Sequence, residues 1–199
     1  EALGRALGET IIPPRFRDVH QHGLEHFIKT GEGLVLNRLS EFRAIRRDGS
    51  EFPVELSISP IKTGDVITFC GFITDITERK KAAESLSLLA AIVESSDDAI
   101  IGKDLDGKIV SWNTGAERMF GFTDEEAVGK GIDFIVPPER IDEERSLSER
   151  IRAGYTEHLI TVRLRKDGTP LHVSLTVSPI KDAEEKIIGA SSISRDISE

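Results

Sequence analysis

The stretch RKDGTPLHVSLTVSPIK, residues 165–181, decides the fold because the chain contains a closely similar stretch earlier. The earlier copy, RRDGSEFPVELSISPIK, occupies residues 46–62 and aligns with the later copy without a gap. In each copy an Asp-Gly pair precedes a run in which apolar and polar residues alternate, which predicts a β-hairpin with a half-buried strand. We expect positive φ at both residues of each Asp-Gly turn. A repeat of this length indicates one structural unit written twice.

A connecting helix is predicted between the two copies, in TDITERKKAAESLSLLAAIVESSDD, residues 74–98. Apolar residues recur there every three or four positions, as on one face of an amphipathic helix. We expect Thr77 to be the N-cap and Glu78 to interact favourably with the positive end of the helix dipole. The apolar face needs a packing partner, and its members are Ala82, Leu86, Leu89 and Val93.

The remaining patterns predict an α+β fold. In the first copy we expect a helix over 15–29, stopped by the glycines that follow it, and strands over 34–46, 51–61 and 66–74. The second copy is longer at its front. There we expect strands over 99–104 and 108–112, a helix over 115–120 capped by Asn113 or Thr114, a helix over 139–152, and strands over 158–165, 171–180 and 186–195. Strands at both ends with helices between them imply an antiparallel sheet with its helices on one face.

Composition narrows the class of protein. The net charge of −9 and the pI near 5.2 argue against nucleic-acid binding and direct membrane contact, because both surfaces attract clustered Lys and Arg. The single cysteine, Cys70, cannot form an intrachain disulfide, which favours a cytoplasmic location. The longest apolar run, residues 88–93, is far shorter than the roughly 20 residues that cross a bilayer. A membrane anchor elsewhere in a longer parent chain stays open.

Several motifs together resemble the PAS domain family: IVSWNTGAERMFGFTDEEAVGK of residues 109–130, the Asp-Gly hairpin, SPIK and the closing RDIS. The resemblance covers residues 97–199 along the whole family pattern. Residues 1–77 match only its later part, so the first copy lacks the first two strands and the first helix. The resemblance implies two modules, the first incomplete, joined by the helix of residues 78–96. Each complete module is expected to have a five-stranded antiparallel sheet with helices on one face.

The resemblance also implies a function. PAS modules commonly belong to bacterial signal-transduction proteins, such as the sensor histidine kinases of two-component systems and cyclases, in which they sense a ligand, dimerise and pass a change along a helix. The junction between last strand and output helix carries over to Asp75 and Thr77, and to Asp196 and Ser198. We therefore expect a homodimer that senses a ligand, a redox change or a partner, and a small-molecule ligand is one of these alternatives. This chain should have no catalysis of its own, and its parent is expected to be a histidine kinase or a cyclase.

The truncated front of the first copy predicts an open sheet edge. In the family the first strand pairs beside the last, so the strand over 66–74 would lack a neighbour on one side. Exposed edges recruit other strands. We predict that the connecting helix, a partner chain or an N-terminal segment covers this edge.

Three histidines, His20, His22 and His26, raise the question of a cofactor. The last two spell H-x-x-E-H, a zinc-protease motif, but no third ligand is apparent and the equivalent helix of the second copy has no histidine. His20 falls where haem-binding PAS domains carry their proximal ligand, so haem through His20 is an alternative to a plain helix-surface histidine. Binding of no cofactor is the leading expectation. Cys70 lies on the last strand of the first copy, which argues against flavin photochemistry and for a small buried apolar role.

A set of apolar, aromatic and serine residues in the second copy fits either a packed core or a ligand pocket. They are Trp112, Met119, Phe134, Ile141, Val173, Leu175 and Ser192. Neither the core nor the pocket interpretation is excluded by the spacing. The hypotheses are thus a ligand sensor, a haem-based gas sensor using His20, and a structural spacer that binds nothing.

Overall fold

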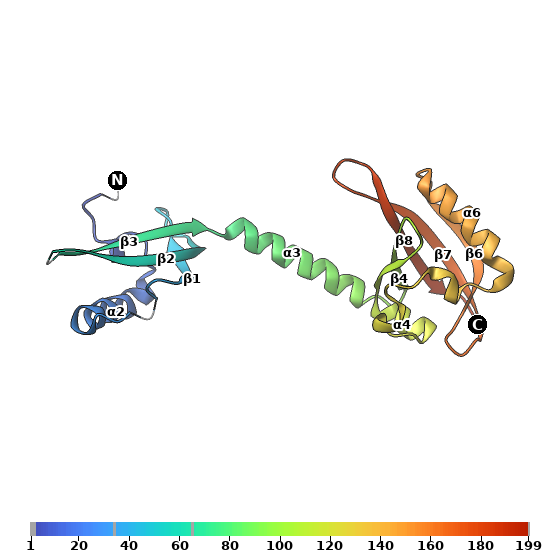
Figure 1. The fold of residues 1–199 in the computed structure, drawn as a ribbon, viewed down its shortest axis with the longest axis horizontal. Helices are drawn as coiled ribbons and strands as arrows, with labels where there is room; N and C mark the ends of the chain where they lie inside the picture. The colour runs from blue at the N-terminus through green and yellow to red at the C-terminus, as the bar shows by residue number, and fades with distance from the viewer. Residues whose placement is uncertain (1–2, 34, 65, 199) are drawn as a thin grey trace. The chain divides into compact units, whose positions relative to one another are not determined.

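The chain forms two compact units. The computed structural model describes residues 3–33, 35–64 and 66–198. Contacts divide the chain into Glu1–Leu86, called unit 1 below, and Ser87–Glu199, called unit 2. Each unit has its own antiparallel sheet, whose strands are labelled in Figure 1.

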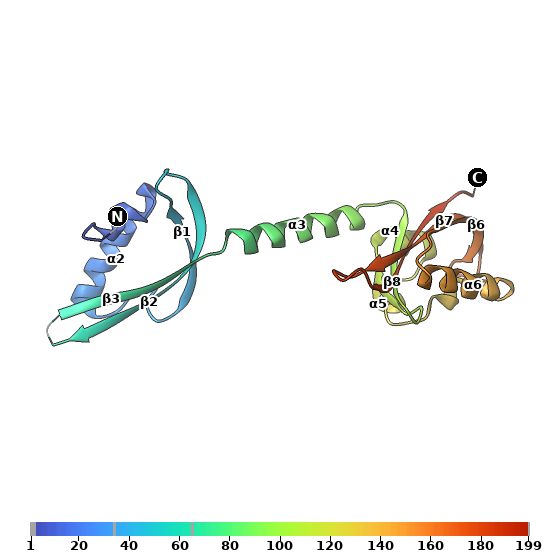
Figure 2. The same ribbon diagram turned by 90° about the horizontal axis from the view of Figure 1, so that it is seen from above.

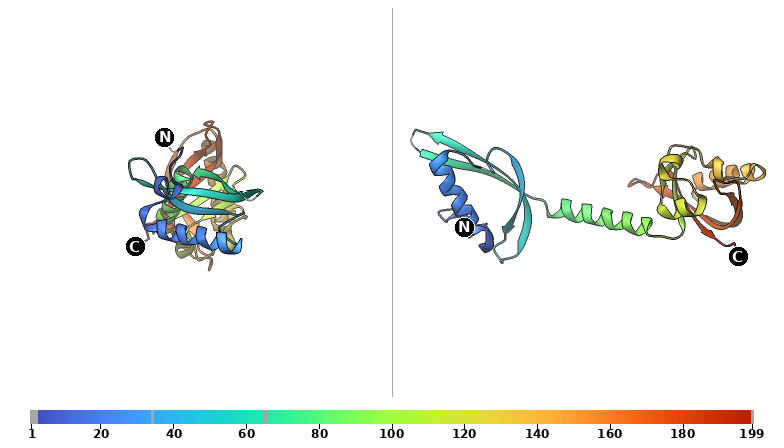
Figure 3. Two further views of the ribbon diagram at one scale, coloured as in Figure 1. Left: turned by 90° about the vertical axis from the view of Figure 1, so that its left-hand side faces the viewer. Right: turned by 90° about the horizontal axis from the view of Figure 1, so that it is seen from below.

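Unit 1 consists of a three-stranded sheet and one long helix. The strand order is β1-β2-β3, with both pairs antiparallel. Phe27 of the helix contacts Phe69 of β3 edge to face, with ring centroids 5.2 Å apart, so α2 lies against one face of the sheet (Figure 3). The elements are α1 Leu7–Thr10, the 3-10 helix η1 Pro14–Phe16, α2 Arg17–Thr30, β1 Leu39–Ile45, β2 Glu51–Thr63 and β3 Val66–Asp75.

The first strand of unit 1 is shorter than predicted. It begins at Leu39, because Asn37 has a positive φ of 57° that interrupts an extended chain. Leu36 makes only an isolated bridge to Ile58, and Leu34 lies outside the described residues. The predicted helix is present as α2, and it ends as expected at Gly31, whose φ is 75°.

The hairpin turn differs from the predicted one. Asp48 does not have positive φ; only Gly49 does, with φ 87°. The Arg46 N–H donates to the Ser50 carbonyl and the Gly49 N–H donates to the Arg46 carbonyl, which is a tight turn closed by a glycine bulge. The Asp48 carboxylate accepts from the Ser50 N–H and thereby fixes the turn. The later hairpin is the same, with Gly168 at φ 81°.

Unit 2 contains the predicted five-stranded antiparallel sheet, in the order β5-β4-β8-β7-β6. Its helices pack on one face and enclose the core (Figure 2). The α+β fold class is therefore confirmed, with the first copy incomplete. The elements are β4 Ala99–Asp104, β5 Ile109–Trp112, α4 Thr114–Phe120, α5 Asp124–Ala127, η2 Ile132–Ile135, η3 Pro138–Arg140, α6 Ile141–Arg152, β6 Glu157–Leu164, β7 Pro170–Lys181 and β8 Ile187–Asp196.

Asn113 organises the front of unit 2. Its Oδ1 accepts from the backbone N–H groups of Ala116, in the first turn of α4, and Ile100, in β4. Its Nδ2 donates to the carbonyls of Val93 and Asp98. Asn113, rather than Thr114, is therefore the cap of α4, and it also ties this helix to β4 and to the end of the connecting helix.

The connecting helix α3 spans Thr77–Glu94 and has no buried residue. Leu86, Leu89 and Val93, predicted to pack, are exposed in the single chain. The predicted N-cap is wrong by one residue, because the Ile76 carbonyl accepts the first helical hydrogen bond, from the Lys80 N–H. Within the described part of the chain, no helix combines the length and apolar character that a membrane crossing needs.

Candidate functional site

The seven predicted ligand residues lie in or beside the packed interior of unit 2. The structure buries Trp112, Met119, Val173, Leu175 and Ser192, and it half-buries Phe134 and Ile141. The aromatic members touch one another: the rings of Trp112 and Phe134 have centroids 6.2 Å apart. Trp112, Met119, Val173 and Leu175 are therefore part of the core, Phe134 packs against it, and a role in ligand binding stays a prediction.

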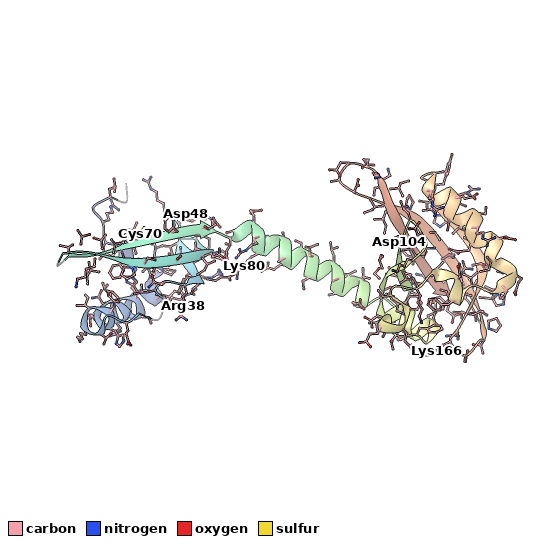
Figure 4. The ribbon with its side chains drawn as sticks, in the orientation of Figure 1. Arg38, Asp48, Cys70, Lys80, Asp104 and Lys166 are labelled. Atoms are coloured by element: carbon pink, nitrogen blue, oxygen red, sulfur yellow. The ribbon has the colours of Figure 1, made fainter. Side chains whose placement is uncertain are left out.

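A small, partly open cavity lies at the edge of the same core. Its volume is about 20 Å³, enough for about one water molecule. Lys103 and Ala190 line it from the sheet, and Leu147 and Ile151 line it from α6. Asp104, at the end of β4 and marked in Figure 4, borders it as well. None of the seven predicted residues lines this cavity, so the sequence did not locate it.

A buried charge cluster lies beside the cavity. Lys103 of β4 and Arg163 of β6 belong to strands that β8 and β7 separate in the sheet. Both meet Glu144 of α6: Lys103 Nζ donates to Oε1 at 2.7 Å, and Arg163 Nη2 donates to Oε2 at 3.0 Å. The exposed fractions of Lys103, Glu144 and Arg163 are 5%, 4% and 3%. Glu144 thus links α6 to two strands that are not neighbours in the sheet, β4 and β6, through buried charges.

Glu143 extends the cluster toward solvent. Its Oε1 accepts from the Thr161 hydroxyl at 2.5 Å, and its Oε2 accepts from Arg140 Nη1 at 2.8 Å. Arg163 Nη1 lies 3.7 Å from Oε1 of Glu143. The cluster therefore contains three cationic and two anionic side chains, an excess of one positive charge.

Burial and pairing shift the pKa values of this cluster. Burial lowers the pKa of Arg163 below its ordinary value, although Glu144 and Glu143 oppose this change. Burial raises the pKa of Glu143, but the hydrogen bonds from Thr161 and Arg140 outweigh it, so the pKa lies below its ordinary value. Glu143 thus stays ionised beside Arg163 at neutral pH.

Sequence reasoning missed this cluster, although a signal was present. Glu144 shares a helix face with Leu147 and Ile151, both buried, so a charged residue stands at a core position of α6. Lys103 and Arg163 likewise occupy inward positions of their strands, where alternation calls for apolar residues. Three charges at core positions predict a buried ionic contact, because such charges are almost never buried without partners.

The second feature is the junction at the end of β3. Arg46 Nη2 donates to Asp75 Oδ2 at 2.6 Å, which ties the hairpin turn to the last strand. Thr77 donates its N–H (2.9 Å) and its hydroxyl (2.5 Å) to Asp75 Oδ1. The N–H of buried Ile76 donates to the Pro53 carbonyl of β2. The first turn of α3 is thereby anchored to the sheet of unit 1.

The junction at the end of β8 repeats this arrangement. Arg165 Nη2 donates to Asp196 Oδ2 at 3.0 Å, and Ser198 donates its N–H to Asp196 Oδ1 at 2.8 Å. The Ile197 N–H donates to the His172 carbonyl of β7. The structure thus brings together the residues predicted at both junctions. It adds the arginine of each hairpin, Arg46 and Arg165, which was not predicted from the sequence.

Hydrogen bonding lowers the pKa of both junction aspartates. At Asp75 the Thr77 hydroxyl is the largest cause, followed by the Thr77 N–H and Arg46, and the pKa falls to about 2. At Asp196 the backbone N–H of Ser198 is the largest cause, and the pKa also lies below its ordinary value. Both carboxylates are therefore ionised acceptors at neutral pH.

The predicted haem ligand, His20, lies on α2 beside α1. Its Nδ1 lies 3.7 Å from where a Cβ on Gly8 of α1 would be, so the imidazole faces this short helix. A larger hollow in unit 1, lined by His26, Glu32 and Arg38 among others, does not include it. Within the described residues there is no group of three or more His, Cys, Asp and Glu able to hold a metal ion. Cys70, marked on β3 in Figure 4, is half-buried rather than buried.

Comparison with known proteins identifies the family. The PAS fold family model matches residues 87–197, and a second PAS domain model matches residues 1–78. The chain belongs to the PAS family, which the motifs of the second copy had indicated.

The relatives include proteins named as sensors. The sensor protein FixL of Bradyrhizobium diazoefficiens is 32% identical over 53% of this chain and 23% of its own length. The oxygen sensor protein DosP of Escherichia coli is 21% identical over 92% of this chain and 23% of its own length. The crystal structure of a PAS domain from Colwellia psychrerythraea is 29% identical, with a TM-score of 0.53, and covers 57% of this chain and 97% of that one. The chain thus spans less than a quarter of the length of both named relatives.

Proposed function

We propose that the chain is the signal-input region of a longer bacterial signalling protein, in which unit 2 senses a small molecule and the junctions relay the change. The observation that carries this proposal is the repeated contact of a hairpin arginine, a strand-end aspartate and the N–H two residues beyond. A change in the curvature of the sheet would move the hairpin arginine and the aspartate together. The attached segment would then change its direction or stability.

The relay is tested at Asp75. Replacing Asp75 by Ala removes the acceptor of the Thr77 N–H and frees Arg46, so we expect several-fold faster hydrogen exchange in the first turn of α3. Asp48→Ala is the matched control, because Asp48 also accepts from the second residue after it but lies in the hairpin turn. Equal exchange of α3 in the two variants would count against a relay role for Asp75. Mass-spectrometric peptide mapping provides the measurement.

The signalling role itself is tested in unit 2. A panel of small metabolites is screened for compounds that raise the melting temperature of the intact chain. For each such compound, we expect the exchange of residues 193–198 to change in the wild type and to remain unchanged in Asp196→Ala. A bound compound that alters these residues equally in both proteins would remove the relay from the proposal. The output domain is expected to be a histidine kinase or a cyclase in the parent protein, and its location the cytoplasm.

We further propose that the chain is a homodimer through α3. The row of Leu86, Leu89 and Val93 has the alternating spacing of a coiled-coil seam, and all three side chains are exposed in the single chain. A second copy presents the same row, so a two-fold axis pairs it with itself. This contact would give the helix a defined partner through which a change can pass.

Oxygen sensing is a second candidate function, because the alignment with the oxygen sensor DosP spans most of the chain. It would require haem at His20, whose imidazole faces α1. We expect the purified chain, incubated with haemin and freed of excess by gel filtration, to show no Soret band that depends on His20. A band lost in His20→Ala but kept in His22→Ala would favour this candidate instead.

A further inference from the structure

The ammonium group of Lys103 has unused hydrogen-bonding capacity inside unit 2. Lysine carries three N–H donors, and within the described residues Glu144 Oε1 is the one acceptor recorded for Lys103 Nζ. The surrounding cluster has one more positive than negative charge. The two buried cations of this site favour a carboxylate between them, since a buried charge without a partner is costly.

The cavity beside Lys103 supplies an apolar wall. Leu147 and Ile151 of α6 line it from the helix side, and Val177 and Ala190 line it from the sheet. All four are buried. Its volume of about 20 Å³ is too small for an organic ligand, but one of its walls is the helix that carries Glu144. Movement of α6 away from the sheet would therefore enlarge the cavity and withdraw Glu144 from the two cations in a single step.

We propose that this cluster binds the carboxylate of a short-chain monocarboxylic acid, and that the carboxylate of Glu144 competes with the ligand for Lys103 and Arg163. The ligand head would take the two contacts that Glu144 makes, and its alkyl tail would lie against Leu147 and Ile151. This inference deepens the proposed sensing function by naming the ligand class, and it rests on that function only for the consequence of binding.

The energetics of such an exchange are balanced. One carboxylate replaces another between the same two cations, so the buried charge of the site does not change. The released Glu144 regains water, and the cost is the loss of the contacts that hold α6 on the sheet. The apparent affinity is therefore set by the competition with Glu144, and weakening this competitor must strengthen binding. A cation of the same size is excluded, because it would meet two buried positive charges.

The test is an NMR titration of the intact, isotope-labelled chain with sodium butyrate and with sodium acetate at constant ionic strength. We expect saturable shifts of the backbone signals of Lys103, Arg163 and residues 141–152, with butyrate binding more tightly than acetate because its tail buries more apolar surface. Sodium chloride is the control for an anion without a carboxylate. Butylammonium chloride is the control for the alkyl tail with a positive head group. Neither should produce these shifts.

Three variants locate the site. Glu144→Gln removes the competing charge and should bind butyrate at least about tenfold more tightly. Glu149→Gln, an exposed acid on the same helix, should bind like the wild type. Lys103→Met should show no saturable response. If Glu144→Gln or Lys103→Met fails to fold, the wild-type shift map decides alone.

Absence of saturable wild-type shifts at tens of millimolar butyrate overturns the proposal. It is also overturned if the shifts map away from the cluster, or if Glu144→Gln folds and binds no more tightly. These results would leave the exchange measurement on Asp75→Ala untouched, so failure of the ligand class is distinguishable from failure of the relay.

Discussion

The two units share a hairpin and a junction, yet they differ in how far their sheets are closed. In unit 2 the last strand, β8, pairs with β7 on one side and β4 on the other. In unit 1 the equivalent strand, β3, pairs with β2 alone among the described residues. The difference shows that the repeated hairpin determines the pairing of the shared strands. Burial of apolar side chains depends on the segment that precedes the hairpin.

The cores of the two units reflect this difference. Unit 1 buries few apolar side chains, chiefly Phe27, Val54 and Ile76. Unit 2 buries a continuous cluster to which β4, β5, α4 and α5 all contribute. The front of the module therefore supplies a large share of the apolar side chains whose burial stabilises unit 2. The expectation that the connecting helix, a partner chain or an N-terminal segment covers the open edge of β3 stays a prediction.

The largest contrast is expected from matched Phe to Ala substitutions. Phe120 in unit 2 is 0% exposed, so Phe120→Ala should lower the free energy of unfolding of this unit by about 3–5 kcal/mol. Phe72 on β3 is 74% exposed, and Phe72→Ala should change stability by less than about 0.5 kcal/mol. Urea unfolding followed by NMR signals of each unit gives both values. A large cost at Phe72 would mean that this face of unit 1 is covered in solution, and the comparison between the units would fail.

The next contrast concerns ionic contacts. Lys103→Met removes one of the two cations that contact buried Glu144 and leaves its Oε1 without a donor, so we expect a loss of about 3 kcal/mol in the stability of unit 2. In unit 1, Arg79 pairs with Glu55 at 2.8 Å and with Glu41 at 3.3 Å on the surface, and Arg79→Met should leave stability nearly unchanged. The same unfolding experiment measures both. A comparable loss at Arg79 would show that surface ion pairs contribute substantially to the stability of unit 1, whose core is small.

Features that produce a recognisable sequence pattern could be predicted, and contacts between distant residues could not. The strands, the hairpins and the antiparallel sheet were predictable from alternation, the Asp-Gly turns and the repeat. The junction aspartates came from the resemblance to the PAS family, and their signalling role stays a prediction. The arginines that bind these aspartates were not predicted. Arg46 and Asp75 are far apart in the sequence, and only the pairing of β1, β2 and β3 brings them together.

The buried cluster is an intermediate case. The position of Glu144 on the apolar face of α6 was readable, but its partners lie on β4 and β6, which are not adjacent in the sheet. The predicted turn conformation at Asp48 was wrong for a different reason. An Asp-Gly pair fits both a two-residue turn and a glycine bulge, and the choice depends on the register of the strands. Local pattern therefore predicts elements well, and long-range contacts only where a repeat reveals them.

The two faces of α3 give a smaller contrast. Leu89 is 60% exposed in the single chain and lies in the proposed dimer seam, so Leu89→Asp should weaken self-association by about 2 kcal/mol, roughly thirtyfold. Leu88 is similarly exposed but lies outside the row of Leu86, Leu89 and Val93, and Leu88→Asp should have much less effect. Sedimentation equilibrium measures the dissociation constant. Equal effects of the two variants would place the association of chains elsewhere than on this seam.

The smallest contrast lies in the titration of the two junction aspartates. The pKa of Asp75 is lowered to about 2, so this carboxylate contributes stability that is complete above its ordinary pKa of 3.8 and is lost as the pH falls toward 2.

The Thr77 hydroxyl is the largest cause of the lowered pKa of Asp75, and Thr77→Ala should therefore raise this pKa clearly. At Asp196 the largest cause is the backbone N–H of Ser198, which Ser198→Ala retains, so the pKa of Asp196 should rise less. NMR titration of the side-chain carboxyl carbons between pH 5 and pH 1.5, roughly the range over which such a lowered carboxyl titrates, distinguishes the two. Equal shifts in both variants would mean that the junctions hold their aspartates through the same bonds, and the contrast drawn from the hydroxyl at position 77 would be wrong.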